Sequence, residues 1–264
     1  MSVLPFSEMP FNSKRVDVEA GTDPSSFGAD LRASVEAWRA EGTTAVWIEC
    51  PAAAGGCLGA ASELGFTFHH AEGTQATLSL WLDESTESKI PDYATHTIGV
   101  GGFVMNDAGE VLVVKELASG ASAQYKLPGG MADVGEDLAE CASREVFEET
   151  GVETEFESLV AFRHRHNEGI GGRSNIYFVV RLKPTGSTEI DMDETELSEC
   201  RWMPLEEYIG IVRQPSPDGG YGMNGEVAHW VQQMQTGEAA GKVIYEQLVE
   251  GTRGPAKLYH VSSL

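Results

Sequence analysis

The chain has 264 residues, of which 41% are hydrophobic and 22% charged, proportions typical of a folded globular protein rather than a disordered one. Its formal net charge of −23 at pH 7 repels nucleic-acid backbones and anionic membranes, so neither is expected as a partner. No stretch approaches the roughly 20 apolar residues that cross a bilayer, and the N-terminus lacks the pattern of a signal or transit peptide, so we expect a cytoplasmic protein.

Residues 1–82 predict a small α/β domain. Apolar residues recur at helical spacing between Asp23-Pro24, a typical helix start, and Gly42. The run TTAVWIEC then indicates a strand, GGCLGAASELGF a second helix, and FTFHHAEGTQATLSLWL two strands around a turn. The order is similar to an acetyltransferase-like fold. The segment AAAGGCLGAAS lacks that fold's pyrophosphate-binding loop, so we do not expect acyl transfer.

The polar, proline-containing residues 83–96 indicate a linker, and a second domain is expected over residues 97–235. TIGVGGFVM and EVLVVKE predict a hairpin, SLVAFRHRH and SNIYFVVRL two further strands, and CRWMPLEEYIG a strand that leads into a helix. GEVAHWVQQMQTG predicts a last helix. Residues 236–264 are expected to form an extension that packs on this domain. Mixed strands and helices of this kind indicate an α+β fold with a mixed sheet covered by helices.

Two groups of potential metal ligands are interpreted as structural. The four cysteines have no zinc-binding spacing and are expected to be reduced thiols. His69 and His70 are adjacent in a predicted strand, where neighbouring side chains point to opposite faces. We therefore expect them to serve packing or an interface rather than to bind one metal ion.

The segment LPGGMADVGEDLAECASREVFEETGV concentrates acidic residues on a predicted helix from Asp137 to Thr150. One stripe of this helix is apolar and must face the core; it comprises Leu138, Ala139, Ala142 and Val146. Glu145, Glu148 and Glu149 converge beside that stripe, near the helix C-terminus, where negative charge is unfavourable. A solvated charged face is the ordinary interpretation of a Glu-rich helix, but this spacing favours another.

Hard divalent cations such as Mg²⁺ or Mn²⁺ would relieve this repulsion, because they bind carboxylate oxygens and keep positions open for phosphate and water. Gly129 and Gly130 precede the helix, allow close backbone approach, and can offer a carbonyl ligand. Arg144 is placed to pair with Glu140 and with Glu136, which would lock the loop onto the helix.

The segment resembles the Nudix box, G-x5-E-x7-R-E-U-x-E-E-x-G-U with U a bulky aliphatic residue. All nine specified positions match, from Gly130 to Val152. The resemblance implies a Nudix α/β/α sandwich with a mixed sheet, and metal-assisted hydrolysis of a nucleoside diphosphate linked to another moiety. It assigns the metal ligands to Glu145, Glu148, Glu149 and the Gly130 carbonyl, and a catalytic supporting role to Glu136 and Arg144.

Further segments, among them AVWIECP, HTIGVGGFVMNDAGEVLVVKE and RWMPLEEY, are similar to the plant-type ADP-ribose/NADH Nudix hydrolases and the animal protein encoded antisense to fibroblast growth factor. This branch carries an α/β region before the Nudix domain. The resemblance implies ADP-ribose or NADH as substrate, AMP plus a phosphorylated product, and a homodimer. CoA derivatives, diadenosine polyphosphates, and a non-catalytic nucleotide-binding role remain alternatives. Ser174-Asn175 departs from the Ser-Asp of many relatives, which leaves the specificity open.

RHRHNEGIGGR, which follows the box, is the one markedly basic stretch of this acidic chain. We expect Arg163, His166 and Arg173 to contact substrate phosphates or ribose, together with Gly129 before the box. A polar strand end that balances local acid is the alternative. Three later glutamates are candidates for a general base or an extra ligand: Glu194, Glu196 and Glu199.

Overall fold

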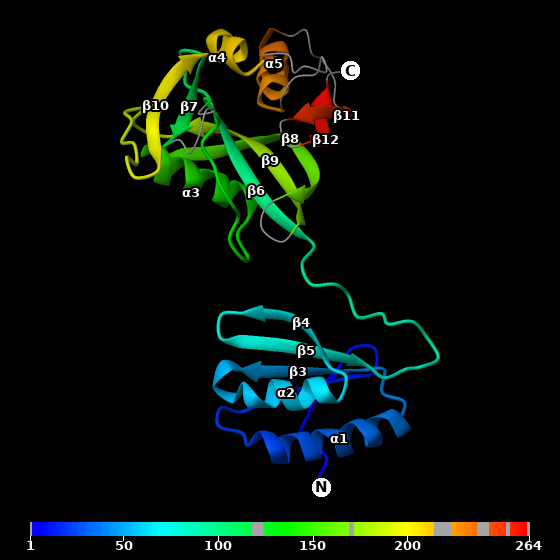
Figure 1. Ribbon diagram of the computed structural model, residues 1–264. Helices are drawn as coiled ribbons and strands as arrows, with labels where there is room; N and C mark the ends of the chain where they lie inside the picture. Colours follow the sequence, from blue (N-terminus) through cyan, green and yellow to red (C-terminus); the bar gives the residue numbers. More distant parts are fainter. Residues whose placement is uncertain are drawn as a thin grey trace. The chain divides into compact units, whose positions relative to one another are not determined.

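The computed structural model describes residues 2–117, 124–168, 172–213, 223–236, 243–251 and 254–262 (Figure 1). The chain divides into two compact units, residues 1–94 and 95–264, and the division falls inside the expected linker 83–96. None of the described helices is long and apolar enough to span a membrane.

The first unit is a five-stranded sheet in the order β1-β2-β3-β5-β4. Its strands are β1 (Ser7–Met9), β2 (Ser13–Asp17), β3 (Ala45–Pro51), β4 (Thr67–Glu72) and β5 (Gln75–Trp81). Helices α1 (Pro24–Ala40) and α2 (Gly56–Glu63), with the 3-10 turn η1 (Ala52–Ala54) before α2, pack against the sheet. The Asp23 carboxylate accepts a hydrogen bond from the Ser26 N–H at 2.9 Å and caps α1, as the predicted helix start requires.

The expectation that His69 and His70 point to opposite faces is wrong. The register of β4 on β5 shifts between Phe68 and His70, so a bulge adds one residue to β4. The two Nδ1 atoms consequently lie 2.7 Å apart, and both rings contact the ring of Tyr93. Their observed role is packing, as expected, although the strand geometry behind that expectation does not hold.

The second unit contains a five-stranded mixed sheet in the order β11-β12-β8-β9-β6 and a two-stranded sheet of β10 and β7. The strands are β6 (His96–Val104), β7 (Glu110–Glu116), β8 (Thr154–Glu168), β9 (Arg173–Pro184), β10 (Leu197–Pro204), β11 (Val243–Gly251) and β12 (Gly254–Ser262). β6 runs parallel to β9, whereas the other pairs are antiparallel. β12 pairs with β8, so the C-terminal residues extend this sheet.

Residues 126–132 connect the two sheets. They run along the edge of β6 that is not paired with β9. The N–H groups of Gly102 and Val100 donate hydrogen bonds to the carbonyls of Pro128 and Gly130, both at 2.8 Å. Lys126 then pairs with Val114 of β7. The loop before α3 is therefore fixed to β6 by its own backbone.

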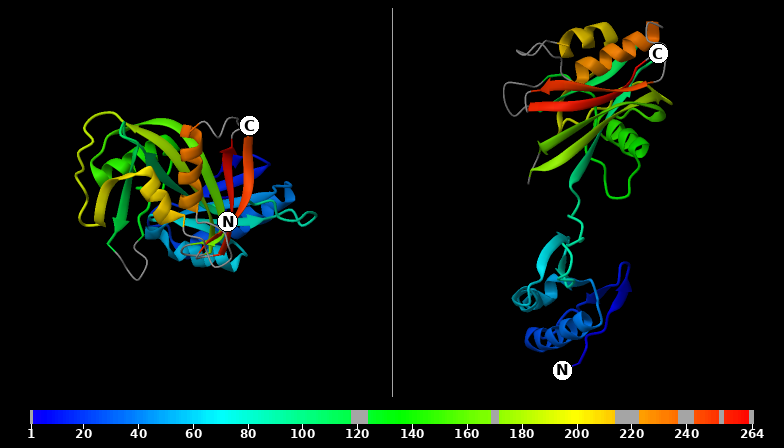
Figure 2. Two further views of the ribbon diagram at one scale, coloured as in Figure 1. Left: turned by 90° about the horizontal axis from the view of Figure 1, so that it is seen from above. Right: turned by 90° about the vertical axis from the view of Figure 1, so that its right-hand side faces the viewer.

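Helices cover both faces of this mixed sheet, which confirms the α+β class and the sandwich arrangement (Figures 1 and 2). α3 (Leu138–Thr150) packs one face through Ala142 and Val146 against Val100 and Val180. α4 (Leu205–Val212) and α5 (Met223–Thr236) pack the other face, where Tyr208 and Val231 join the same core as Phe103.

Candidate active site

The helix α3 begins and ends close to the predicted limits. Asp137 is its N-cap, and the Asp137 N–H and the Glu140 carboxylate form half of a capping box, 3.4 Å apart. Gly151 ends the helix with a left-handed φ of 72°. Glu140 thus satisfies the helix start, and the expected pair between Glu140 and Arg144 is not formed in the structure.

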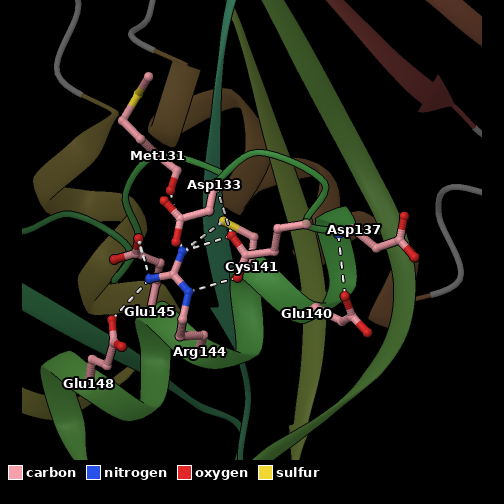
Figure 3. A network of polar contacts seen from close by, with 9 residues as sticks. Met131, Asp133, Asp137, Glu140, Cys141, Arg144, Glu145 and Glu148 are labelled. Carbon is pink, nitrogen blue, oxygen red and sulfur yellow. Dashed lines mark hydrogen bonds and ion pairs between the residues drawn. The ribbon is translucent and has the colours of Figure 1, made fainter. Parts of the chain in front are cut away.

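Arg144 instead connects the loop to the helix through Glu136. Figure 3 shows its guanidinium between Met131 of the loop and Glu145 and Glu148 of α3. Its Nε and Nη2 donate to the two Glu136 oxygens at 2.7 and 2.9 Å, a bidentate pair. The same guanidinium donates to Glu145 at 3.0 Å and to Glu148 at 2.9 Å. The hydrogen bonds from Arg144 hold the pKa of Glu136 at about 2, so this carboxylate stays charged.

Glu149 is the buried carboxylate of the helix, with 6% of its surface exposed. Burial raises its pKa to about 7, against the opposing effects of Lys126 and of the Gly129 N–H; Glu145 and Glu196 raise it further. The Gly129 N–H donates to Glu149 Oε2 at 3.0 Å. A buried carboxylate with an elevated pKa beside other acids marks a site able to exchange a proton or accept a cation.

Gly129 and Gly130 make this approach of backbone and carboxylates possible. Gly129 has a φ of 150°, and a Cβ there would come within 2.1 Å of the Val100 carbonyl oxygen. A Cβ on Gly130 would come within 2.6 Å of both Glu145 oxygens. Only glycine therefore fits at Gly129, and a side chain at Gly130 would push the Glu145 carboxylate away.

The structure thus brings Glu145, Glu149 and Gly130 together, whereas Glu148 is turned toward Arg144 and largely exposed. Among the residues that the structure describes, no three His, Cys, Asp or Glu side chains form a group that could hold a metal ion as they stand. The donor chemistry nevertheless fits a hard cation, since it comprises carboxylates and a glycine carbonyl around a buried acid with a raised pKa.

The loop after β9 places one of the three later glutamates near Glu149. The N–H groups of Asp191 and Asp193 donate to the carbonyls of Thr150 and Glu149 at the end of α3, at 2.9 and 3.1 Å. Glu196 follows and raises the pKa of Glu149 through its charge. By contrast, Glu199 accepts hydrogen bonds from Lys115 and Tyr125. The Glu194 side chain forms no hydrogen bond or ion pair with the residues that the structure describes.

The expected basic cluster after the box is not a single site. Arg163 donates to Asn175 Oδ1 at 3.2 Å and lies over the Tyr177 ring, on the sheet face of α4 and α5. His166, three residues on in β8, faces the opposite side and contacts Ser174 Oγ at 2.9 Å. Arg173 lines a cavity of about 640 Å³ on that opposite side, next to the loop of the box. The glycine-rich tip, residues 169–171, lies outside the described residues.

Sequence reasoning missed the residues that surround Arg163. Asn175 is buried and donates through Nδ2 to Thr97 Oγ1 at 3.1 Å. Tyr177 pairs with Gly99 of β6 and sits over the bare backbone of the strand. The alternation in SNIYFVV would have predicted that Asn175 and Tyr177 share a face of the strand. The pairing of this strand with TIGVGGF could not be predicted from either segment alone.

Comparison with known proteins accounts for both units. The NUDIX domain model matches residues 95–221, and the Nudix hydrolase domain model matches residues 4–82. The chain is 39% identical over 210 residues to Nudix hydrolase 2 of Arabidopsis thaliana, covering 79% of this chain and 74% of that protein. It is 40% identical over 192 residues to human nucleoside diphosphate-linked moiety X motif 6, covering 72% of this chain. The match spans 60% of the length of the human relative.

Proposed function

The chain belongs to the Nudix hydrolase family, and from this premise we propose that it is a divalent-metal-dependent pyrophosphohydrolase acting on a nucleoside diphosphate linked to another moiety. One observation carries the proposal: the residues that match the family's box bring Glu145 and the buried Glu149 against the Gly129-Gly130 backbone. Oxygen ligands beside a backbone that tolerates close approach are what a cation and a diphosphate require.

The proposed metal ligands are Glu145, Glu148, Glu149 and the Gly130 carbonyl, with Mg²⁺ or Mn²⁺ as the ion. When bound, the ion supplies positive charge for the diphosphate and lowers the pKa of an attacking water. Glu148 is exposed and held by one hydrogen bond from Arg144, so a change of side-chain rotamer suffices to redirect it. Arg144 would keep its bidentate contact with Glu136 while it released Glu145 and Glu148.

The chain's own groups have distinct tasks in this scheme. Arg144 and Glu136 hold the loop of residues 131–136 on α3, and the Gly129 N–H orients the Glu149 carboxylate. With Glu149 assigned to the metal ion, the nearby Glu196 is the candidate to accept a proton from the attacking water. Arg163 is positioned to bind a negatively charged part of the substrate.

We propose ADP-ribose or NADH as the substrate, with AMP and a phosphorylated remainder as products. The resemblance to plant-type relatives supports this choice, and the name of the human relative refers to nucleoside diphosphate-linked moieties in general. Arg163, His166 and Arg173 remain the proposed substrate contacts. Arg163 and His166 lie on opposite sheet faces. Arg163 lies over Tyr177, whose pKa is also affected by Glu145 and Glu149, so we propose Arg163 rather than His166 as the residue that binds the diphosphate.

A substrate panel tests the proposal. ADP-ribose, NADH, NAD⁺, FAD, CoA and diadenosine polyphosphates are assayed with Mg²⁺ and with Mn²⁺, alongside Glu149→Gln as the inactive control. We expect metal-dependent release of AMP from ADP-ribose or NADH, abolished in Glu149→Gln without loss of the fold. Turnover of CoA or diadenosine polyphosphates alone would reassign the substrate. Binding without turnover of any compound would instead favour a nucleotide-binding role.

A further inference from the structure

The sheet of the first unit has two different faces. One face packs with α1 and α2 through a core that includes three residues of β3 and β5: Val46, Ile48 and Leu78. Because successive side chains of a strand point to opposite faces, Trp47 and Trp81 belong to the other face. Two large aromatic side chains therefore lie on the side of this sheet that faces away from its helices.

The segment of residues 83–93 lies on this second face. The Trp81 indole N–H donates to the Asp83 carbonyl oxygen at 2.8 Å, near the start of the segment. His69 Nε2 lies 2.8 Å from the carbonyl oxygen of Pro91, near its end. The segment and the sheet together line a cavity of about 510 Å³. A cavity of this volume is large enough to hold a small molecule.

The walls of this cavity are mainly aromatic and aliphatic. Trp47 lies opposite Ser79, two residues from Trp81 on the neighbouring strand, so the two tryptophans are diagonal neighbours on one face. Diagonal side chains of this kind lie about 7 to 8 Å apart, so a planar ring can pack against both indoles. Four further apolar residues line the cavity: Met9, Phe11, Ile90 and Pro91.

Phe11 is held at the edge of the cavity in an unfavourable backbone conformation. Phe11 and Asn12 have φ angles of 64° and 54°, in the left-handed region that an aromatic residue rarely adopts. Phe11 is 91% exposed, so burial of its ring does not hold the turn. Hydrogen bonds from Thr44 to the carbonyls of both residues hold it instead. A strained turn that keeps an aromatic ring in water beside an apolar cavity indicates a bound partner.

Two hydrogen-bond donors at the cavity have no acceptor among the residues that the structure describes. These donors are the ammonium of Lys89 and the indole N–H of Trp47. The Asp83 carboxylate also lines the cavity, but it accepts hydrogen bonds from the Ser85 N–H at 3.0 Å and from Thr86 Oγ1 at 2.8 Å. Because the unused groups are a cation and a neutral donor, they favour a ligand that carries a negatively charged acceptor.

We propose that this cavity of the first unit binds an aromatic anion, whose ring packs on Trp47 and Trp81 and whose acidic group contacts Lys89. A cationic ligand would be repelled by the ammonium, and an uncharged hydrocarbon would leave both donors without an acceptor. Every residue that lines the cavity belongs to residues 1–94, so the site is separate from the carboxylates of the box. A bound ligand would also contact both the sheet and the segment of residues 83–93.

The first test uses naphthalene-2-sulfonate as the probe, titrated calorimetrically into the full chain. A chelator keeps the protein free of metal. We expect saturable binding that Lys89→Gln weakens about tenfold, the loss expected for a hydrogen bond to a charged group. Lys183→Gln removes the same charge from β9 and should bind like the unsubstituted protein. The uncharged 2-naphthalenemethanol should bind more weakly than the sulfonate and equally well to both variants.

Phe11→Gly separates a binding role from a structural one. Glycine adopts a φ of 64° without strain, so the thermal midpoint of this variant should equal or exceed that of the unsubstituted protein. Loss of the ring should nevertheless weaken binding of the sulfonate about three- to tenfold. A fall in affinity without a fall in stability is the result that a merely structural side chain would not give.

Three results would overturn the proposal. They are no saturable binding of the sulfonate, equal affinity for the sulfonate and the alcohol, and equal affinity of the sulfonate for Lys89→Gln, Phe11→Gly and Lys183→Gln. If the sulfonate binds as expected, competition assigns the source of the ligand. Displacement of the probe by AMP would indicate a nucleotide, and displacement by indole-3-acetate would indicate an aromatic carboxylic acid.

Discussion

The backbone N–H of Gly129 donates a hydrogen bond to the carboxylate of Glu149 across 3.0 Å, joining the loop just before the box to the last turn of α3. This contact lies in a buried region, where the pKa of Glu149 is raised to about 7 from an ordinary value of 4.5. A hydrogen bond from a backbone N–H favours the charged carboxylate, but here desolvation is the larger effect.

Glu149 should make the stability of the metal-free protein depend on pH. Between pH 4.5 and about 7 the native state binds more protons than the unfolded state, so the free energy of unfolding should fall as pH rises through this interval. The contribution is up to about 3 kcal/mol. Urea denaturation with a chelator, from pH 4.5 to 7.5, measures it. Glu149→Gln should give a flatter curve, and parallel curves would refute this origin.

Arg144→Lys should weaken metal binding and activity, although it keeps the charge. A lysine cannot reproduce the two parallel hydrogen bonds to Glu136 and cannot reach Glu145 and Glu148 at the same time. We expect a loss of roughly 10- to 100-fold in metal affinity, measured by titration with Mn²⁺. Arg181→Lys is the matched control, because Arg181 pairs with Glu157 outside the site. An equal loss in both variants would exclude a specific role for the Arg144 contacts.

The same Arg144 variant should lose acid resistance. The lowered pKa of Glu136 contributes stability that is present above pH 4.5 and is lost as pH falls toward 2. Arg144→Lys should therefore unfold at a higher pH than the unsubstituted protein in an acid titration followed by circular dichroism. An unchanged acid midpoint would show that a lysine holds the Glu136 carboxylate equally well.

Gly129→Ala should be far more damaging than Gly135→Ala. Both glycines have positive φ, 150° and 82°, but a Cβ on Gly129 would meet the backbone of Val100, whereas nothing lies within 4 Å at Gly135. We expect about 1 kcal/mol of destabilisation for Gly135→Ala and at least about 3 kcal/mol for Gly129→Ala. Thermal or urea unfolding compares them. Similar values would mean that the loop can move away from β6 at little cost.

Asn175→Asp should raise the KM for an anionic substrate. The substitution keeps the shape of the side chain but places a full negative charge against Arg163, and thus reduces the positive potential that Arg163 offers to an anion. We expect an increase of about tenfold in KM for ADP-ribose, with a smaller change in kcat. Asn12→Asp adds the same charge in the first unit and should leave KM unaffected. A similar rise in both would point to a general effect of net charge.

The local sequence was sufficient to predict α3 and the residues around it. The apolar stripe of Ala142 and Val146 faces the core, and the start at Asp137 and the end at Gly151 are where capping chemistry requires them. The partner of Arg144 was not predictable to the same degree, because Glu140 and Glu136 are both within reach of an extended arginine. The capping box resolves the choice, since it engages Glu140 at the helix start.

Contacts between distant strands were beyond what the sequence could indicate. Arg163 meets Tyr177 and Asn175 only because of the register of β8 on β9, which depends on bulges that no local motif marks. The bulge in β4 likewise reversed the expected directions of His69 and His70. Alternation predicts which residues share a face of the sheet. After one extra residue in a strand, however, each later side chain points to the face opposite the predicted one.

The contacts of Arg144 have a consequence for how the protein matures. The Arg144 guanidinium offsets part of the negative charge of Glu145 and Glu148 before any cation arrives, which reduces the repulsion that α3 must overcome to fold without metal. The incoming ion then competes with an arginine side chain rather than with water alone. The apparent metal affinity therefore depends on how much more strongly the ion binds Glu145 and Glu148 than the Arg144 guanidinium does. A substitution that strengthens or weakens the Arg144 contacts would change the metal concentration at which the site fills.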